Sequence, residues 1–189
     1  QRLQNDQLLA HLCHNRAYAL GQINAFAEAV SAYQQAEDMF RTLNAKADLI
    51  RLYINLSQLY AMYGQYSAVE NVREKAQQLL TELPGMEQAR HRLTLLHIQT
   101  IIKQRATIQL HLLQALHLAQ ASFQQQGPQL EEGIALILLG DCYRLLKQFP
   151  EAELYYERVS RLVQNNVNRL LEHRASYGLA QIAHQRGKQ

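Results

Sequence analysis

Histidine and cysteine are the residues that could hold a metal or act as nucleophiles, and three of them, His11, Cys13 and His14, form a short cluster near the start of the chain. His11 and His14 are three residues apart and would share one face of a helix, whereas Cys13 would point away from that face. A metal needs more ligands than these two histidines. Cys142 is isolated, and no CxxC pair occurs. We therefore expect no metal site, and the two lone thiols favour a reducing cytoplasm.

Other motifs of catalysis are missing from the sequence. It has no HExxH pattern of zinc proteases, no GxSxG nucleophile elbow, no phosphate-binding P-loop and no GxGxxG. The paired carboxylates Glu131-Glu132 and Glu151/Glu153 fall where helices should begin, and negative charge there complements the helix dipole. These observations predict a protein that is not an enzyme and carries no cofactor.

Composition indicates the kind of element that must position these side chains. Hydrophobic residues make up 48% of the 189 residues, and there are only 8 Gly and 3 Pro. A chain so poor in helix breakers is expected to be all-helical. No apolar stretch approaches the roughly 18 residues of a membrane span. The formal net charge of +3 is too mild to imply nucleic acid, so we expect neither a membrane nor a nucleic acid as partner.

An internal repeat organises the helices. The clearest unit reads Leu136-x2-Leu139-Gly140-x2-Tyr143, followed by Phe149 and Ala152-x3-Tyr156. A second unit reads Tyr53-x2-Leu56-Ser57-x2-Tyr60, and a third has Ala17-x2-Leu20 followed by Ala29-x3-Tyr33. Two weaker units align through Leu96 and Ala180. The spacings between Ala17, Ser57, Leu96, Gly140 and Ala180 are 40, 39, 44 and 40 residues.

These units resemble the tetratricopeptide repeat (TPR), a helix–turn–helix unit in which a small residue of the first helix lets the second pack closely. The period exceeds the usual 34 residues or so. In this longer period and in the phrase GLAQIAHQRG (178–187), the chain resembles the long repeats of two groups of bacterial proteins. These are the large LuxR-type activators of the maltose-regulator kind and the CHAT-domain proteins. The resemblance implies an all-α, TPR-like α-solenoid of about nine helices in antiparallel pairs, forming a right-handed superhelix.

The repeat sets the expected boundaries. We predict a single repeat domain over 1–189, cut from a longer protein, with units at roughly 10–43, 50–83, 89–122, 133–166 and a truncated 173–189. Turn residues such as Gly64-Gln65, Pro84-Gly85 and Asn165-Asn166 separate the predicted helices. These are 3–21, 25–43, 45–63, 66–82, 87–103, 106–125, 129–147, 150–164 and 168–187. The repeat register favours a hairpin turning near 103–106, although periodicity alone also permits one long helix over 87–126.

The same register predicts the core. Ala17, Ser57 and Gly140 should lie at close helix contacts, and four tyrosines should be large packing anchors: Tyr33, Tyr60, Tyr143 and Tyr156. In the last half-unit, we expect apolar side chains to be left partly uncovered: Leu170, Leu171, Leu179, Ile182 and Ala183.

The resemblance places the binding surface on the concave face, which the first helices of the units line. By position, the partner-binding groove would contain His14, Tyr18, Arg51, Gln58, Arg90, His97, Asp141, Arg144, Arg174 and Tyr177. Further positions on these faces are His11, Gln22, Met62, Thr100, Gln181 and His184. Because arginine recognises carboxylates with paired donors, an acidic peptide or protein is the partner that this set would suit.

Three functions remain open on the sequence. The first is a protein–protein interaction and sensor module of a larger bacterial signalling or transcription regulator, which binds a peptide, a protein or a neighbouring domain of the same chain. The second is the regulatory arm of a multidomain enzyme, such as a CHAT-type protease, whose catalytic domain lies outside these residues. The third, an RNA-reading solenoid, is disfavoured by the mild charge.

Overall fold

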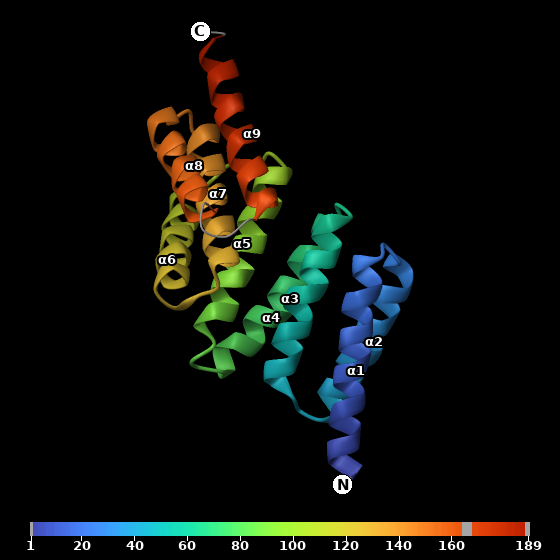
Figure 1. The fold of residues 1–189 in the computed structure, drawn as a ribbon. Coiled ribbons are helices and arrows are strands. Elements are labelled where there is room, and N and C mark those ends of the chain that lie inside the picture. The colour runs from blue at the N-terminus through green and yellow to red at the C-terminus, as the bar shows by residue number, and fades with distance from the viewer. Residues whose placement is uncertain (1, 164–167, 188–189) are drawn as a thin grey trace. The chain divides into compact units, whose positions relative to one another are not determined.

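The computed structural model describes residues 2–163 and 168–187, and over these ranges it contains nine helices and no strand (Figure 1). The helices are α1 (Arg2–Gln22), α2 (Phe26–Thr42), α3 (Lys46–Met62), α4 (Tyr66–Glu82), α5 (Glu87–Lys103), α6 (Leu110–Gln126), α7 (Gln129–Leu145), α8 (Phe149–Val163) and α9 (Arg169–Arg186). The predicted all-α, solenoid-like arrangement of paired helices is confirmed for these residues. The turn predicted at Asn165-Asn166 lies outside them.

The stretch between residues 87 and 126 is a pair of helices rather than one long helix. Helix α5 ends at Lys103 and α6 begins at Leu110, which is four residues later than the sequence predicts. The delay arises because Arg105 adopts a left-handed backbone (φ 55°) that ends α5, after which residues 106–109 form no helix.

Five helix ends share this left-handed turn. After α5, the backbone N–H of Arg105 donates to the carbonyl of Ile102 (3.1 Å) and that of Ala106 to Ile101 (3.0 Å). This pair of hydrogen bonds is the Schellman motif, in which the residue with positive φ is usually glycine. The same two bonds recur at the other four ends. The left-handed residues are Asn24, Asn44, Gly64, Arg105 and Lys147.

Contacts divide the chain into two compact units, residues 1–96 and 97–189, with the boundary inside α5. In the first unit, α1 pairs with α2 and α3 with α4, while α2 also contacts α3 (Figure 1). Tyr33 and Phe40 of α2 are fully buried there, together with Tyr53 of α3. Ala17 and Ser57, predicted at close contacts, are 0% exposed. By contrast, one side of α1 is uncovered, with Leu8, Leu9 and Leu12 all exposed.

The second unit is built around Tyr156. Helix α7 contacts α6, α8 and α9, and α8 also contacts α9. The Tyr156 side chain is fully buried, and a Cβ added at Gly140 or Gly178 would lie 2.6 or 2.3 Å from its ring atoms. The predicted close contact at Gly140 is therefore confirmed, and Gly178 makes a matching contact from α9. Tyr60 and Tyr143 are partly buried, so they anchor the packing less completely than Tyr33 and Tyr156.

Helix α9 is better covered than the sequence predicts. Leu170 is 68% exposed, as expected, but Leu171 and Ile182 are buried. The expectation was wrong for these two residues because α9 packs against both α7 and α8. No helix among the described residues combines the length and the apolar character needed to cross a membrane.

Candidate functional site

The predicted groove residues all lie on the first helices of the pairs. Five belong to the first unit, on α1, α3 and the start of α5: His14, Tyr18, Arg51, Gln58 and Arg90. The other five belong to the second unit, on the end of α5, α7 and α9: His97, Asp141, Arg144, Arg174 and Tyr177. Each unit therefore presents its own half of the predicted surface.

His14 faces the interior of the first unit. Its Nε2 lies 3.0 Å from the side-chain nitrogen of Asn55 on α3. Its ring packs against Tyr33 and Phe40, with centroids 5.8 and 6.1 Å away. Burial lowers the pKa of His14 below its usual value, and the nearby positive charge of His11 lowers it further. His14 is thus a neutral packing residue that joins α1 to α3.

The other groove residues of α1 and α3 face solvent. Tyr18 is 49% exposed, and Gln58 is exposed. The guanidinium of Arg51 donates to Asp48 at 3.0 Å, and His11 lies 3.9 Å from the other oxygen of the same carboxylate. The charge of Arg51 is therefore compensated within its own helix.

The side chain of Arg90 on α5 contacts the end of α4. Its guanidinium donates to the backbone carbonyl of Leu80 in the last turn of α4, where carbonyls lack partners within the helix. It also lies 3.5 Å from the carboxylate of Glu87. Both contacts hold the side chain near the α4–α5 turn.

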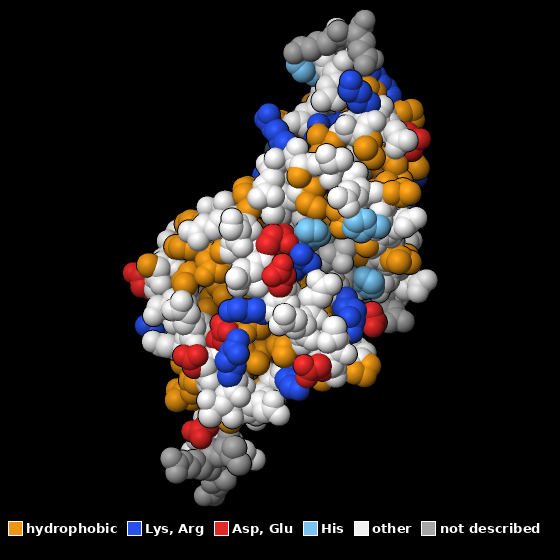
Figure 2. All heavy atoms as spheres, turned by 180° about the vertical axis from the view of Figure 1, so that it is seen from behind, with side chains coloured by type: hydrophobic (Ala, Val, Ile, Leu, Met, Phe, Trp, Pro, Cys, Tyr) orange, Lys and Arg blue, Asp and Glu red, His pale blue; other side chains and the backbone are white. Residues whose placement is uncertain are grey.

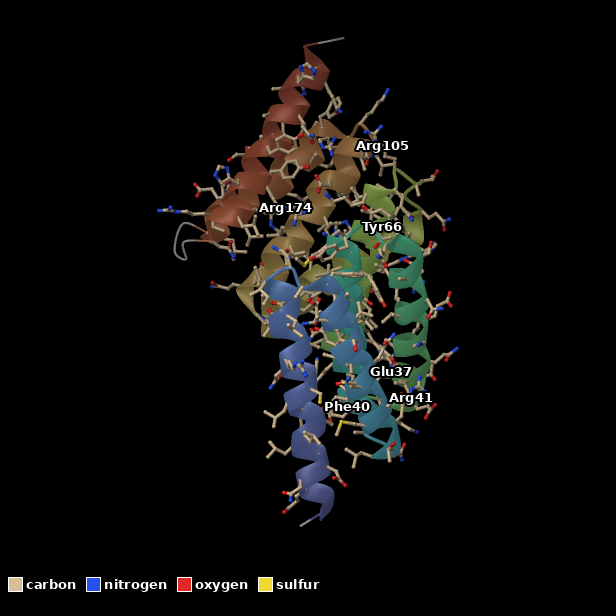
Figure 3. All side chains as sticks on the ribbon, turned by 90° about the vertical axis from the view of Figure 1, so that its right-hand side faces the viewer. Glu37, Phe40, Arg41, Tyr66, Arg105 and Arg174 are labelled. Carbon is tan, nitrogen blue, oxygen red and sulfur yellow. The ribbon has the colours of Figure 1, made fainter. Side chains whose placement is uncertain are left out.

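In the second unit, Asp141 is the centre of a partly buried charge network. The hydroxyl of Tyr156 on α8 donates to Asp141 at 2.7 Å. Arg144, on the same helix, lies 3.6 Å from this carboxylate, and Arg174 on α9 lies 3.9 Å from it (Figure 3). Burial and the negative charge of Asp141 raise the pKa of Tyr156 well above its usual value, so its hydroxyl stays protonated. Two guanidiniums face one carboxylate, which leaves a surplus of positive charge.

The remaining two predicted residues of this unit differ in exposure. Tyr177 on α9 is 66% exposed, whereas His97 on α5 is partly buried.

A hollow of about 610 Å³ opens in the second unit beside this network. It is formed by the end of α5, the α5–α6 connection, the end of α7 and α9. Its lining residues are Ile102, Arg105, Ala106, Thr107, Ile108, Arg144, Leu145, Leu146, Gln181 and Gln185. The structure thus brings Arg144 and Gln181, two positions predicted on the inner faces, into one concave site.

Arg105 was missed by the sequence analysis. It lies on the α5–α6 connection (Figure 3) and is exposed, whereas the prediction considered only first-helix positions. No residue at this turn signals it in the sequence, since the left-handed position of such a turn is usually glycine or asparagine.

A second charge network, in the first unit, has a structural role. Tyr53 on α3 donates to the carboxylate of Glu37 on α2 at 2.7 Å, and Arg41 donates to it at 2.8 Å. Lys75 on α4 lies 3.6 Å away. Burial opposes ionisation of Glu37, but these partners outweigh it and hold its pKa below the usual value. The compensated carboxylate of Glu37, which Figure 3 labels together with Arg41, therefore links α2 to α3 and α4.

Two observations concern groups that could take part in catalysis. No three His, Cys, Asp or Glu side chains among them gather closely enough to hold a metal ion. Burial and the nearby Asp141 raise the pKa of Cys142 to about 12, so its thiol stays protonated and is a poor nucleophile. The face in Figure 2 shows positive and negative side chains interspersed among apolar ones, with no large area of one sign.

Comparison with protein-family models gives no match for this chain, and no curated protein matches it either. The likeness to the tetratricopeptide repeat therefore rests on the residues of the chain itself. What the structure adds to it is the all-helical fold of paired helices.

Proposed function

We propose that this chain is a protein–protein interaction module that binds a peptide segment, a protein or a neighbouring domain. The observation that carries the proposal is the hollow formed by α5, α7 and α9. Its volume of about 610 Å³ falls within the range of roughly 300–1,000 Å³ that is common for ligand sites. It mixes apolar walls with a few hydrogen-bonding side chains, which is the composition that such sites usually have.

The proposed setting is a larger bacterial signalling or transcription regulator, in which the module acts as a sensor in the cytoplasm. This setting rests on the long-period repeat alone. The alternative, a regulatory arm of a multidomain enzyme such as a CHAT-type protease, rests on the same repeat. The domain encoded beside these residues distinguishes the two: a DNA-binding domain supports the regulator, and a protease domain supports the enzyme arm.

The binding function can be tested by selecting a displayed library of random seven-residue peptides on the whole 189-residue chain. Gln185 lines the hollow and is exposed, so Gln185→Trp should fill part of it without disturbing the core. We expect this variant to weaken selected peptides at least about tenfold, which corresponds to about 1.4 kcal/mol. Gln114→Trp, at an exposed position of α6 away from the hollow, is the matched control. Failure to select any peptide, or equal effects of both variants, would contradict the proposal.

A further inference from the structure

The four arginines predicted to attract an acidic partner already have carboxylates of their own. Arg51 pairs with Asp48, and Arg90 with Glu87. Arg144 and Arg174 share Asp141. Their positive charge is therefore largely compensated inside the chain, apart from the surplus at the Asp141 network.

Arg105 is different. In the part of the chain that the structure describes, no carboxylate forms an ion pair with it, and its side chain is exposed at the hollow. The described residues that line the hollow include two arginines and no Asp or Glu. Gln181, Gln185 and Thr107 add hydrogen-bonding groups. Because Arg144 shares Asp141, the positive charge of the hollow comes mainly from Arg105 on the α5–α6 connection, which has no carboxylate partner among the described residues.

The rest of the lining is apolar. Ile102 and Ile108 come from the two sides of the α5–α6 connection, and Leu145 and Leu146 from the end of α7. Both leucines are more than 40% exposed. An occupant that covered them would gain roughly 25 cal/mol for each Å² of apolar surface removed from water. The hollow therefore presents apolar surface directly beside a free guanidinium.

We infer that the hollow binds an extended peptide segment in which an acidic side chain lies next to an apolar one. The guanidinium of Arg105 pairs with the carboxylate, and the apolar side chain packs on Leu145 and Leu146. Arg144, whose side chain is only 11% exposed, adds positive potential from the wall. This inference rests on the proposed function and gives the chemistry of its ligand.

The test uses the peptide selection described above, with two further variants of the whole chain. Arg105→Gly removes the guanidinium but keeps the left-handed turn, because glycine adopts positive φ freely. Lys147→Gly is its matched control: it removes one positive charge from the same position of the same turn motif, at a residue that does not line the hollow. Far-ultraviolet circular dichroism of both variants checks that the helices are intact.

We expect the selected peptides to be enriched in Asp or Glu beside Leu, Ile, Val or Phe. Arg105→Gly should weaken them about tenfold, as expected for loss of a hydrogen bond to a charged group, and Lys147→Gly by less than about threefold. Replacing the acidic residue of a selected peptide by its amide should abolish the difference between Arg105→Gly and the unchanged chain.

Two results would overturn the inference while leaving the proposed function standing. The first is that the selected peptides lack acidic residues and yet bind the Gln185→Trp variant more weakly than the unchanged chain. The second is that acidic peptides bind the Arg105→Gly variant as tightly as they bind the unchanged chain, or that Lys147→Gly weakens their binding as much as Arg105→Gly does. If no peptide is selected at all, the proposed function fails, and the inference fails with it.

Discussion

The ring of Tyr156 lies between two glycines, Gly140 on α7 and Gly178 on α9, and a methyl group at either position would overlap it. Because Tyr156 is fully buried and donates to Asp141, its ring has little room to move aside. The two glycines are therefore required by the contact with this tyrosine, even though glycine inside a helix costs roughly 1 kcal/mol relative to alanine.

We expect Gly140→Ala and Gly178→Ala each to lower the free energy of unfolding by about 1–3 kcal/mol, since overpacking outweighs the gain in helix propensity. Urea denaturation followed by circular dichroism measures this change. Gly187→Ala is the control, because the nearest atom to its added Cβ is 3.5 Å away, an ordinary contact. A stabilising effect of Gly140→Ala would show that the Tyr156 ring yields easily.

Burial lowers the pKa of three histidines, His14, His91 and His117, which should make stability depend on pH. Each pKa lies below the usual histidine value of 6.5, and the positive charge of Arg158 adds to the effect at His117. Below pH 6.5, the unfolded chain therefore binds more protons than the folded chain at these three sites. Their contribution to stability is complete above pH 6.5 and is lost as the pH falls toward the lowered values.

The measurement is the midpoint of urea unfolding between pH 7.5 and pH 5. We expect stability to fall over this range, and the double variant His14→Gln with His117→Gln to show a smaller fall. An identical slope in the double variant would exclude His14 and His117 as the cause.

At the scale of the helices, the repeated left-handed turn has a measurable cost. Lys147 holds φ at 60° and Gly64 at 68°, in the same hydrogen-bonded turn. A Cβ at Gly64 would meet nothing within 4 Å, so a substitution there tests the backbone conformation without steric overlap.

Gly64→Ala should lower the free energy of unfolding by about 1–2 kcal/mol, the cost of a left-handed backbone for an L-residue. Lys147→Gly should raise it by a smaller amount, because the greater freedom of glycine in the unfolded chain offsets part of the gain. Thermal unfolding of both variants gives the comparison. If the two changes had the same sign, the backbone conformation would not be what determines these effects.

The sequence predicted those features of the helices that depend on local spacing. The repeat register predicted a close helix contact at Gly140 and a packing anchor at Tyr156, and turn residues predicted most helix ends. It did not predict that α6 begins at Leu110, because an arginine at a left-handed turn gives no signal in the usual turn rules.

Features that depend on packing between residues far apart in the chain were harder to predict from the sequence. His14 was placed on the groove, but its neighbour Asn55 lies 41 residues away in the chain and draws it toward the interior. Leu171 was expected to be uncovered, but α7 and α8 bury it. The pairing of each predicted arginine with a carboxylate likewise follows from side-chain geometry that spacing alone does not define.

At the scale of the whole molecule, stability should be local to each unit. In arrays of helix pairs, each pair is stabilised mainly by its immediate neighbours. Gly140→Ala should therefore speed amide hydrogen exchange in α7, α8 and α9, while α2, α3 and α4 of the first unit keep the rates of the unchanged chain. Hydrogen exchange followed by mass spectrometry resolves these segments. Equal acceleration in both units would show that the chain opens as one cooperative body.

The five left-handed turns also bear on how such a chain can diversify. One hydrogen-bonding pattern is compatible with glycine, asparagine, lysine and arginine at the same backbone position, as Gly64, Asn24, Lys147 and Arg105 show. The identity of the residue there changes the charge offered to solvent at a small cost in stability, and the helices on either side keep their register. Mutation or a designed library can therefore change the residue at these positions, and with it what the surface recognises, while the folded core stays as it is.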